Sequence, residues 1–186
     1  MSKHTVAVMG LGVRGKIHIH GLLENPDYYE IVGLCDINQK ALDLVSETYH
    51  LEHVPQFLDA EEMLKTLRPE VFVFVTYPDL RLNMIELAVK YGVKAVSLEK
   101  PMAESLQEAK QMVELCHQHG IKAVVCHQQK YLSQFQRMKK KIEEGVIGDI
   151  RKIHVETQAW FSQLGTHYVD YTLWINGGYR AKWVCG

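Results

Sequence analysis

Short apolar segments alternate with amphipathic segments over the first two thirds of the chain. Residues 71–75, Val-Phe-Val-Phe-Val, are apolar at every position, which is typical of a central parallel strand covered by helices on both faces. Repeated βα units of this kind predict an α/β fold built on a doubly wound parallel sheet. The predicted strands span residues 5–9, 30–35, 71–75, 94–98 and 121–126, and the predicted helices span residues 15–23, 39–49, 60–67, 79–90 and 105–119.

The pattern changes after residue 126. Helical spacing returns over residues 133–144, and strict alternation over residues 153–159 predicts a strand with one solvent-facing side. A last helix is predicted over residues 165–174. We therefore expect a first domain over residues 1–126 and a second, α+β unit over residues 127–186.

Composition excludes several classes of partner. The formal net charge is −1, so we expect neither nucleic acid nor a membrane surface as a partner. No apolar stretch approaches the roughly 20 residues that span a bilayer, and the first residues do not resemble a signal peptide. The 4 cysteines form no C-x-x-C pair, which favours a reduced, cytoplasmic protein. The paired histidines lack a second cluster of ligands, so we expect no metal site; they are His18 and His20, and His117 and His119.

A glycine-rich turn follows the first predicted strand and opens the first predicted helix. Its sequence is Gly10-Leu11-Gly12-Val13-Arg14-Gly15, a G-x-G-x-x-G motif. In such a motif the first glycine permits the tight turn, the second lets backbone approach a pyrophosphate, and the third lets the helix pack on the strand. The helix N-terminus then offers N–H groups and a partial positive charge to phosphates. The motif in this context predicts a dinucleotide-binding Rossmann domain.

Asp36 ends the second predicted strand about 20 residues after Gly15, the interval of the dinucleotide fingerprint. Its carboxylate is suited to accept hydrogen bonds from ribose hydroxyls, and it would repel a 2′-phosphate. Ile37 and Asn38 follow, with no arginine to hold that phosphate. The expected cofactor is therefore NAD, with NADP less favoured. A generic nucleotide or S-adenosylmethionine site is the alternative, because methyltransferases also combine a glycine loop with an acid at a strand end.

Two further segments carry a family resemblance. Glu99-Lys100-Pro101 follows the strand predicted at residues 94–98, and Gly165-Thr166-His167-Tyr168-Val169-Asp170 opens the last predicted helix. Together with the glycine-rich turn, they make the chain resemble the glucose–fructose oxidoreductase / inositol dehydrogenase / rhizopine-catabolism (Gfo/Idh/MocA) family. The resemblance implies an NAD-dependent oxidoreductase that acts on a sugar, polyol or related secondary alcohol.

The resemblance also assigns roles to individual residues. Lys100 would stabilise negative charge on the reacting oxygen, and its bond to Pro101 is often cis in relatives. His167 would exchange a proton with the substrate hydroxyl, and Asp170 would contact His167 or the substrate. The resemblance implies that the loop Thr76-Tyr77-Pro78 and the Glu99-Lys100-Pro101 segment line the cofactor. It places Gln129, Lys130 and Tyr131 on the substrate side.

The sequence departs from the family pattern in three respects. Gln163 stands where relatives often carry an aspartate four residues before the histidine, so we expect Gln163 to contact substrate without acting as a base. Arg81 replaces a histidine in the loop after residue 75. Relatives continue into an open, mostly antiparallel sheet, of which one strand is evident here; exposed strand edges favour a homo-oligomer. These departures leave open an alternative function, a non-catalytic dinucleotide-binding sensor or regulatory protein.

Overall fold

The computed structural model describes residues 2–158 and 160–185, with the backbone alone for residues 162 and 163. The chain divides into two compact units, Met1–Cys126 and His127–Gly186.

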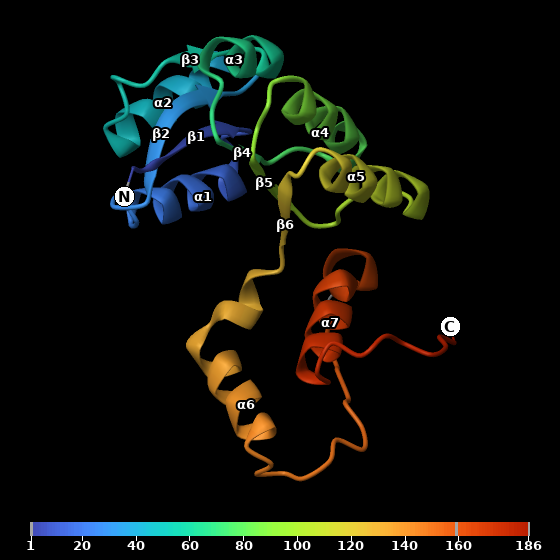
Figure 1. Cartoon of the computed structure of the whole chain (residues 1–186). Coiled ribbons are helices and arrows are strands. Elements are labelled where there is room, and N and C mark those ends of the chain that lie inside the picture. Colours follow the sequence, from blue (N-terminus) through green and yellow to red (C-terminus); the bar gives the residue numbers. More distant parts are fainter. Residues whose placement is uncertain (1, 159, 186) are drawn as a thin grey trace. The chain divides into compact units, whose positions relative to one another are not determined.

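The first unit is built on a six-stranded sheet with the order β3-β2-β1-β4-β5-β6, in which every neighbouring pair is parallel (Figure 1). The prediction of a doubly wound parallel sheet is confirmed. The sheet also includes β3, which sequence patterning did not locate because two residues are too few to show a period. The strands are β1 (His4–Met9), β2 (Tyr29–Cys35), β3 (Gln56–Phe57), β4 (Val71–Phe74), β5 (Ala95–Glu99) and β6 (Lys122–Cys126).

Helices cover the two faces of this sheet and create two apolar layers. Alternate residues of β4 point to opposite faces, so Phe72 and Phe74 join one layer while Val73 joins the other. The first layer includes residues of α3, α4 and α5, and the second includes residues of α1 and α2. This two-sided burial explains why β4 is apolar throughout. The helices are α1 (Val13–Leu23), α2 (Gln39–Tyr49), α3 (Ala60–Leu67), η1 (Pro78–Leu80), α4 (Arg81–Lys90) and α5 (Leu106–Gln118).

The second unit contains η2 (Gln128–Tyr131), α6 (Ser133–Glu143) and α7 (Phe161–Ile175). The rings of Phe135 in α6 and Tyr171 in α7 lie 5.8 Å apart. Lys139 Nζ donates a hydrogen bond of 3.2 Å to the carbonyl of Ile175 at the end of α7. Aromatic packing and this cap therefore join the two helices.

Two expectations for the second unit differ from the structure. Residues 151–158 adopt no regular element, and Ala159, the last position of the alternation, lies outside the described residues. A strand needs a neighbour for its backbone groups, and the described part of this unit supplies none. The last helix begins at Phe161, one turn before the predicted start at Gly165. The Phe161 ring lies 2.8 Å from the position that a Gly165 Cβ would occupy, so the glycine makes room for this ring within the first turn.

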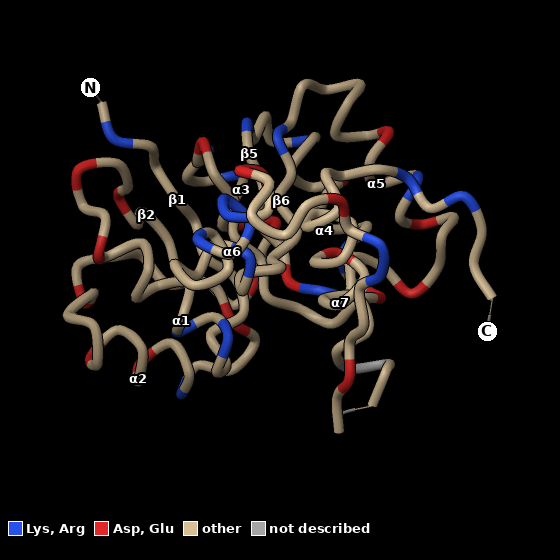
Figure 2. Tube along the Cα trace, turned by 90° about the horizontal axis from the view of Figure 1, so that it is seen from below, with Lys and Arg blue, Asp and Glu red and all other residues tan. Residues whose placement is uncertain are grey.

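Charged residues of both signs are interspersed along the chain (Figure 2). The basic run in α6 is accompanied by acids one turn on: Lys139 and Glu143 lie 3.2 Å apart, and Lys140 and Glu144 lie 3.8 Å apart. This run is therefore a charge-paired helix surface. None of the described helices is both long and apolar enough to cross a bilayer.

We predict that Gly15→Ala destabilises the protein by roughly 1–3 kcal/mol, because overpacked backbone must move. A Cβ at this position would lie 1.9 Å from the carbonyl oxygen of Gly10. Gly21→Ala on the same helix is the matched control, since a Cβ there meets nothing within 4 Å. The control should leave stability unchanged or raise it by about 0.5–1 kcal/mol. Urea unfolding measures both variants, and equal midpoints would contradict the packing role of Gly15.

Candidate functional site

The glycine-rich turn brings three pieces of backbone into direct contact. Gly10 has φ +85°, and a Cβ on it would lie 2.1 Å from the carbonyl oxygen of Val75 after β4. Gly12 differs from Gly10 and Gly15 because a Cβ there would meet nothing within 4 Å. It is the N-cap residue of α1, whose first turn has no side-chain cap and no acidic residue. The space beside Gly12 and the uncapped helix end together suit an anionic ligand.

Asp36 ties this turn to the end of β2. Its carboxylate accepts a hydrogen bond of 2.7 Å from the Leu11 backbone N–H and another of 2.9 Å from the Asn38 backbone N–H. Each oxygen therefore has one backbone donor, and a carboxylate oxygen can accept a further hydrogen bond. The side chain is half-buried, and the residue lines a cavity beside the turn.

An open cavity of about 570 Å³ lies at this edge of the sheet. It is lined by the glycine-rich turn, by Asp36 and by the segments at the ends of β4 and β5. Each of these segments lies in the first unit, at the carboxyl edge of the parallel sheet, where such folds bind ligands. The predicted cofactor residues that line the cavity are Gly10, Gly12, Val13, Arg14, Asp36, Thr76, Tyr77, Glu99 and Lys100. The other predicted residues, Leu11, Gly15, Pro78 and Pro101, adjoin the lining in sequence; the Lys100–Pro101 bond is cis.

Arg81 holds two of the cavity walls together. Its guanidinium donates hydrogen bonds to the carbonyl of Thr76, at 2.7 Å from Nη2, and to the carbonyl of Glu99. The residue is 3% exposed, and burial lowers the pKa of its guanidinium. The sequence identified Arg81 only as a departure from the family pattern. Its bridging role depends on contacts with two separate segments, which sequence spacing does not show.

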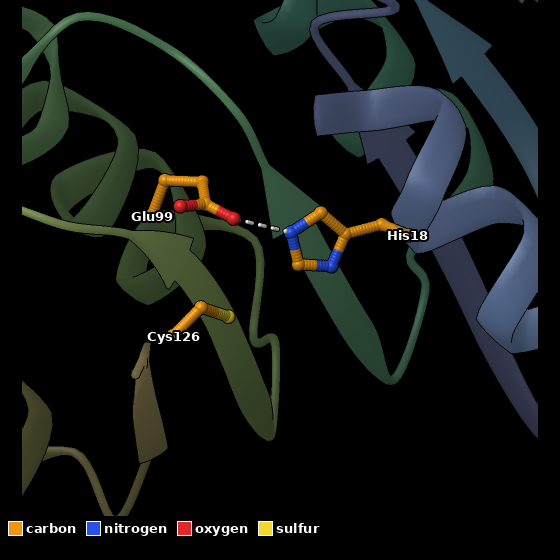
Figure 3. A group of neighbouring side chains, drawn as sticks. All are labelled: His18, Glu99 and Cys126. Atoms are coloured by element: carbon orange, nitrogen blue, oxygen red, sulfur yellow. Dashed lines mark hydrogen bonds and ion pairs between the residues drawn. The ribbon is translucent and has the colours of Figure 1, made fainter. Parts of the chain in front are cut away.

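His18 adds a third tie at the same edge. Its Nε2 lies 3.0 Å from Oε1 of Glu99, and Cys126 lies beside both (Figure 3). Hydrogen bonding to Cys126 and then to Glu99 raises the pKa of His18 to about 9, against the effect of burial. Burial alone would raise the pKa of Glu99, but His18 and the charge of Arg14 lower it overall. The pair is therefore an imidazolium–carboxylate pair near neutral pH.

The second unit gathers most of the remaining predicted residues. His167 on α7 is 4% exposed, and its Nδ1 lies 3.0 Å from the hydroxyl of Tyr171, one turn on. Burial raises the pKa of Tyr171, and the backbone amide of Gln129 opposes that shift. The His127 ring meets the His167 ring edge-on at 5.1 Å. The imidazole is thus held by a neutral hydroxyl from its own helix.

Asp170 forms an ion pair of 3.0 Å with Lys130. Two residues that the sequence assigned to separate roles are therefore joined. Tyr131 is exposed, and the side chain of Gln163 lies outside the described residues. Tyr171 is the residue that sequence reasoning missed. Its position four residues after His167 on a helix is the signal that could have revealed it.

A family model and several curated proteins match this chain. The model of an oxidoreductase family with an NAD-binding Rossmann fold, GFO_IDH_MocA, matches residues 4–127. The D-apiose dehydrogenase of Paraburkholderia graminis is 28% identical over 142 residues, which cover 76% of this chain and 37% of that protein. The NADP(+) D-xylose 1-dehydrogenase of Haloarcula marismortui is 27% identical over 116 residues, covering 62% of this chain and 32% of that protein.

Among solved structures, the WlbA dehydrogenase of Bordetella pertussis, in complex with NADH and UDP-GlcNAcA, superposes with a TM-score of 0.79 and 26% identity. The match covers 94% of this chain and 58% of that one. The chain thus spans about a third of the length of the two curated relatives and under two thirds of the solved one.

We predict that the His18–Glu99 pair stabilises the fold below pH 6.5 and that this contribution is lost as the pH rises through about 9. The folded-state pKa of His18 lies above its unfolded value, so folding takes up a proton in that window. Relative to His18→Gln, the wild type should lose on the order of 1–3 kcal/mol across it. Urea unfolding at a series of pH values measures the difference in unfolding free energy between the two proteins, with EDTA present to remove trace metal ions. A difference that does not change with pH would contradict the imidazolium assignment.

Proposed function

The chain belongs to the GFO_IDH_MocA oxidoreductase family, and on that premise we propose that it transfers a hydride between a nicotinamide dinucleotide and a secondary alcohol of a sugar or polyol. The observation that carries this proposal is the cavity at the carboxyl edge of the sheet, which brings the glycine-rich turn, Asp36 and Lys100 to one space. The dinucleotide supplies the hydride acceptor or donor when bound. The names of the two curated relatives, both sugar dehydrogenases, support the substrate class.

The first unit fits a dinucleotide in two respects. The uncapped N-terminus of α1 and the space beside Gly12 suit a pyrophosphate, because backbone N–H groups and the helix dipole favour negative charge there. The Asp36 carboxylate suits the ribose hydroxyls, with Leu11 and Asn38 N–H groups holding it in place. Ile37, which is 88% exposed, offers no positive charge for a 2′-phosphate. We propose NAD as the cofactor on this basis, although one relative is named for NADP(+).

Lys100 and His167 would carry the chemistry on the protein side. The Lys100 ammonium, at the end of β5, would stabilise negative charge that develops on the substrate oxygen. His167 would take or return the hydroxyl proton, a role for which imidazole is suited near neutral pH. Tyr171 would act as a positioning residue, because its hydroxyl holds Nδ1 of His167 at 3.0 Å. It would fill the place of the orienting acid that Gln163 does not supply.

We also propose that residues 127–186 form part of a substrate and oligomerisation domain. The ion pair between Lys130 of η2 and Asp170 of α7 would position the substrate side. Further contacts would come from Gln129, Tyr131 and Gln163. Several large apolar side chains of this unit are exposed, including Trp160 at 78% and Trp183 at 81%. Contiguous exposed apolar patches mark protein-interaction surfaces, and we propose that these side chains contribute to one.

NADH should stabilise the chain against heat more than NADPH does, because Asp36 repels a 2′-phosphate. A ligand that binds only the folded state adds about 2.7 kcal/mol at a hundredfold excess over Kd. Asp36→Asn should narrow the difference between the stabilisation by NADH and the stabilisation by NADPH. The substitution removes the negative charge but keeps an oxygen that accepts from the Leu11 N–H. Gly12→Ala should weaken both ligands without destabilising the free protein, because its Cβ has open space. A larger shift with NADPH would contradict the assignment.

Turnover with NAD⁺ on a panel of sugars and polyols tests the reaction. Lys100→Ala and His167→Ala should each lower kcat/KM by about 10²–10⁴-fold while NADH binding persists. Tyr171→Phe should lower kcat and move the pH profile with little change in KM, whereas Tyr179→Phe, an exposed control, should do neither. Full activity in the Lys100 and His167 variants would rule out these roles.

NADH binding without turnover by the wild type would favour a non-catalytic dinucleotide-binding protein.

A further inference from the structure

Three elements bring metal-binding side chains together beside the cofactor cavity. His18 comes from the middle of α1, Glu99 ends β5, and Cys126 ends β6. Glu99 and Cys126 are register partners in adjacent parallel strands, so their side chains point to the same face of the sheet. Figure 3 shows His18 extending from α1 toward both of them. One nitrogen, one carboxylate oxygen and one sulfur lie within 4.8 Å of one another.

We propose that His18, Glu99 and Cys126 form a binding site for Zn²⁺ or a cation of similar softness. The three donor atoms are of the types that Zn²⁺ binds in proteins, and sulfur disfavours the harder Mg²⁺ and Ca²⁺. Metal binding displaces the protons of the His18 imidazolium and the Cys126 thiol. The resulting thiolate and the Glu99 carboxylate carry two negative charges, which balance a divalent cation. Three protein ligands leave the fourth tetrahedral position for water.

The present positions of the three donor atoms require only small adjustments to bind zinc. Ligand atoms around a tetrahedral zinc ion lie about 3.3–3.8 Å apart, given metal–ligand distances near 2.0–2.3 Å. His18 Nε2 and Glu99 Oε1 are 3.0 Å apart, so this pair must separate by about 0.3 Å. The widest separation, at most 4.8 Å, must close by at most about 1.5 Å, which side-chain torsions can supply.

A neighbouring hydroxyl contacts one ligand atom, and a guanidinium holds the backbone that carries a second ligand. The Ser97 hydroxyl lies 3.4 Å from Cys126 Sγ, and the Arg81 guanidinium holds the backbone carbonyl of Glu99. A partner such as the Ser97 hydroxyl restricts the direction in which the Cys126 sulfur points, whereas Arg81 fixes only the backbone position of Glu99. Each of the three ligands is partly buried, so the site is neither a surface cluster nor closed to solvent.

The proposed site has a consequence for the adjoining cavity. Glu99 lines the cavity and would also bind the metal, so an ion there would tie α1, β5 and β6 together at the cavity wall. The sequence-based expectation of no metal site considered histidine pairs along helices. It could not include a cluster whose members are separated by 81 and 27 residues.

Cobalt binding to the metal-stripped chain, without cofactor, tests the proposal directly and does not depend on the proposed reaction. Co²⁺ bound to Cys126 should give a thiolate-to-cobalt charge-transfer band that Zn²⁺ removes by displacement. Cys126→Ser should abolish the band and weaken Zn²⁺ binding at least about 10–100-fold. Cys185→Ser, which alters an exposed cysteine, should leave both unchanged.

His18→Gln and Glu99→Gln should each weaken Zn²⁺ binding in titration calorimetry while the cobalt–thiolate band shifts or fades. Far-ultraviolet circular dichroism verifies that each variant is folded; if His18→Gln unfolds, the two cysteine variants decide the question. Absence of the band in the wild type would overturn the proposal. So would its persistence in Cys126→Ser or its loss in Cys185→Ser.

Discussion

Close approach of backbone at the carboxyl edge of the parallel sheet is the constraint on which the first unit depends. Gly10 lies against the Val75 carbonyl, and Gly15 lies against Gly10, each with no room for a Cβ. Because no side chain separates these segments, α1 begins directly above the ends of β1 and β4. The strands are parallel, so the ends of β2 and β5 reach the same edge. Backbone N–H groups, Asp36 and Lys100 therefore meet at one cavity.

A few polar side chains then hold the loops at this edge by their backbone atoms. Asp36 fixes the Leu11 N–H, and Arg81 fixes the carbonyls of Thr76 and Glu99. Hydrogen bonds at buried and partly buried positions are costly to leave unmade, so each loop prefers one position. His18 adds a charged contact to the Glu99 side chain. The cavity walls are in this way held in place by side chains that bridge their backbone segments.

In the second unit, contacts from the single helix α7 hold the predicted site residues in place. His167 and Tyr171 are one turn apart on α7, so helical geometry alone brings the hydroxyl to the imidazole. Asp170 on the same helix forms its ion pair with Lys130 of η2. The proposed chemistry is thus distributed by element. Strand ends of the first unit present the cavity residues and Lys100, while α7 presents the proposed proton-transfer residue with its positioning partner.

Sequence patterning by itself determined the parallel α/β fold, because strands buried on both faces must be apolar throughout and glycines are required where backbone segments touch. It also located α2 and α3 to the residue, since Asn38 and Asp59 cap them through local hydrogen bonds. The local sequence did not determine the conformation of residues 151–158, because a strand forms only where a neighbouring strand pairs with it. Arg81, Tyr171 and the cluster of His18, Glu99 and Cys126 were decided by tertiary structure. Arg81 and the cluster act between segments that are far apart in the sequence, so residue spacing carries no information about their distances. Tyr171 lies one helical turn from His167, a spacing that the sequence does contain, but the hydrogen bond and the burial of the pair depend on the folded helix.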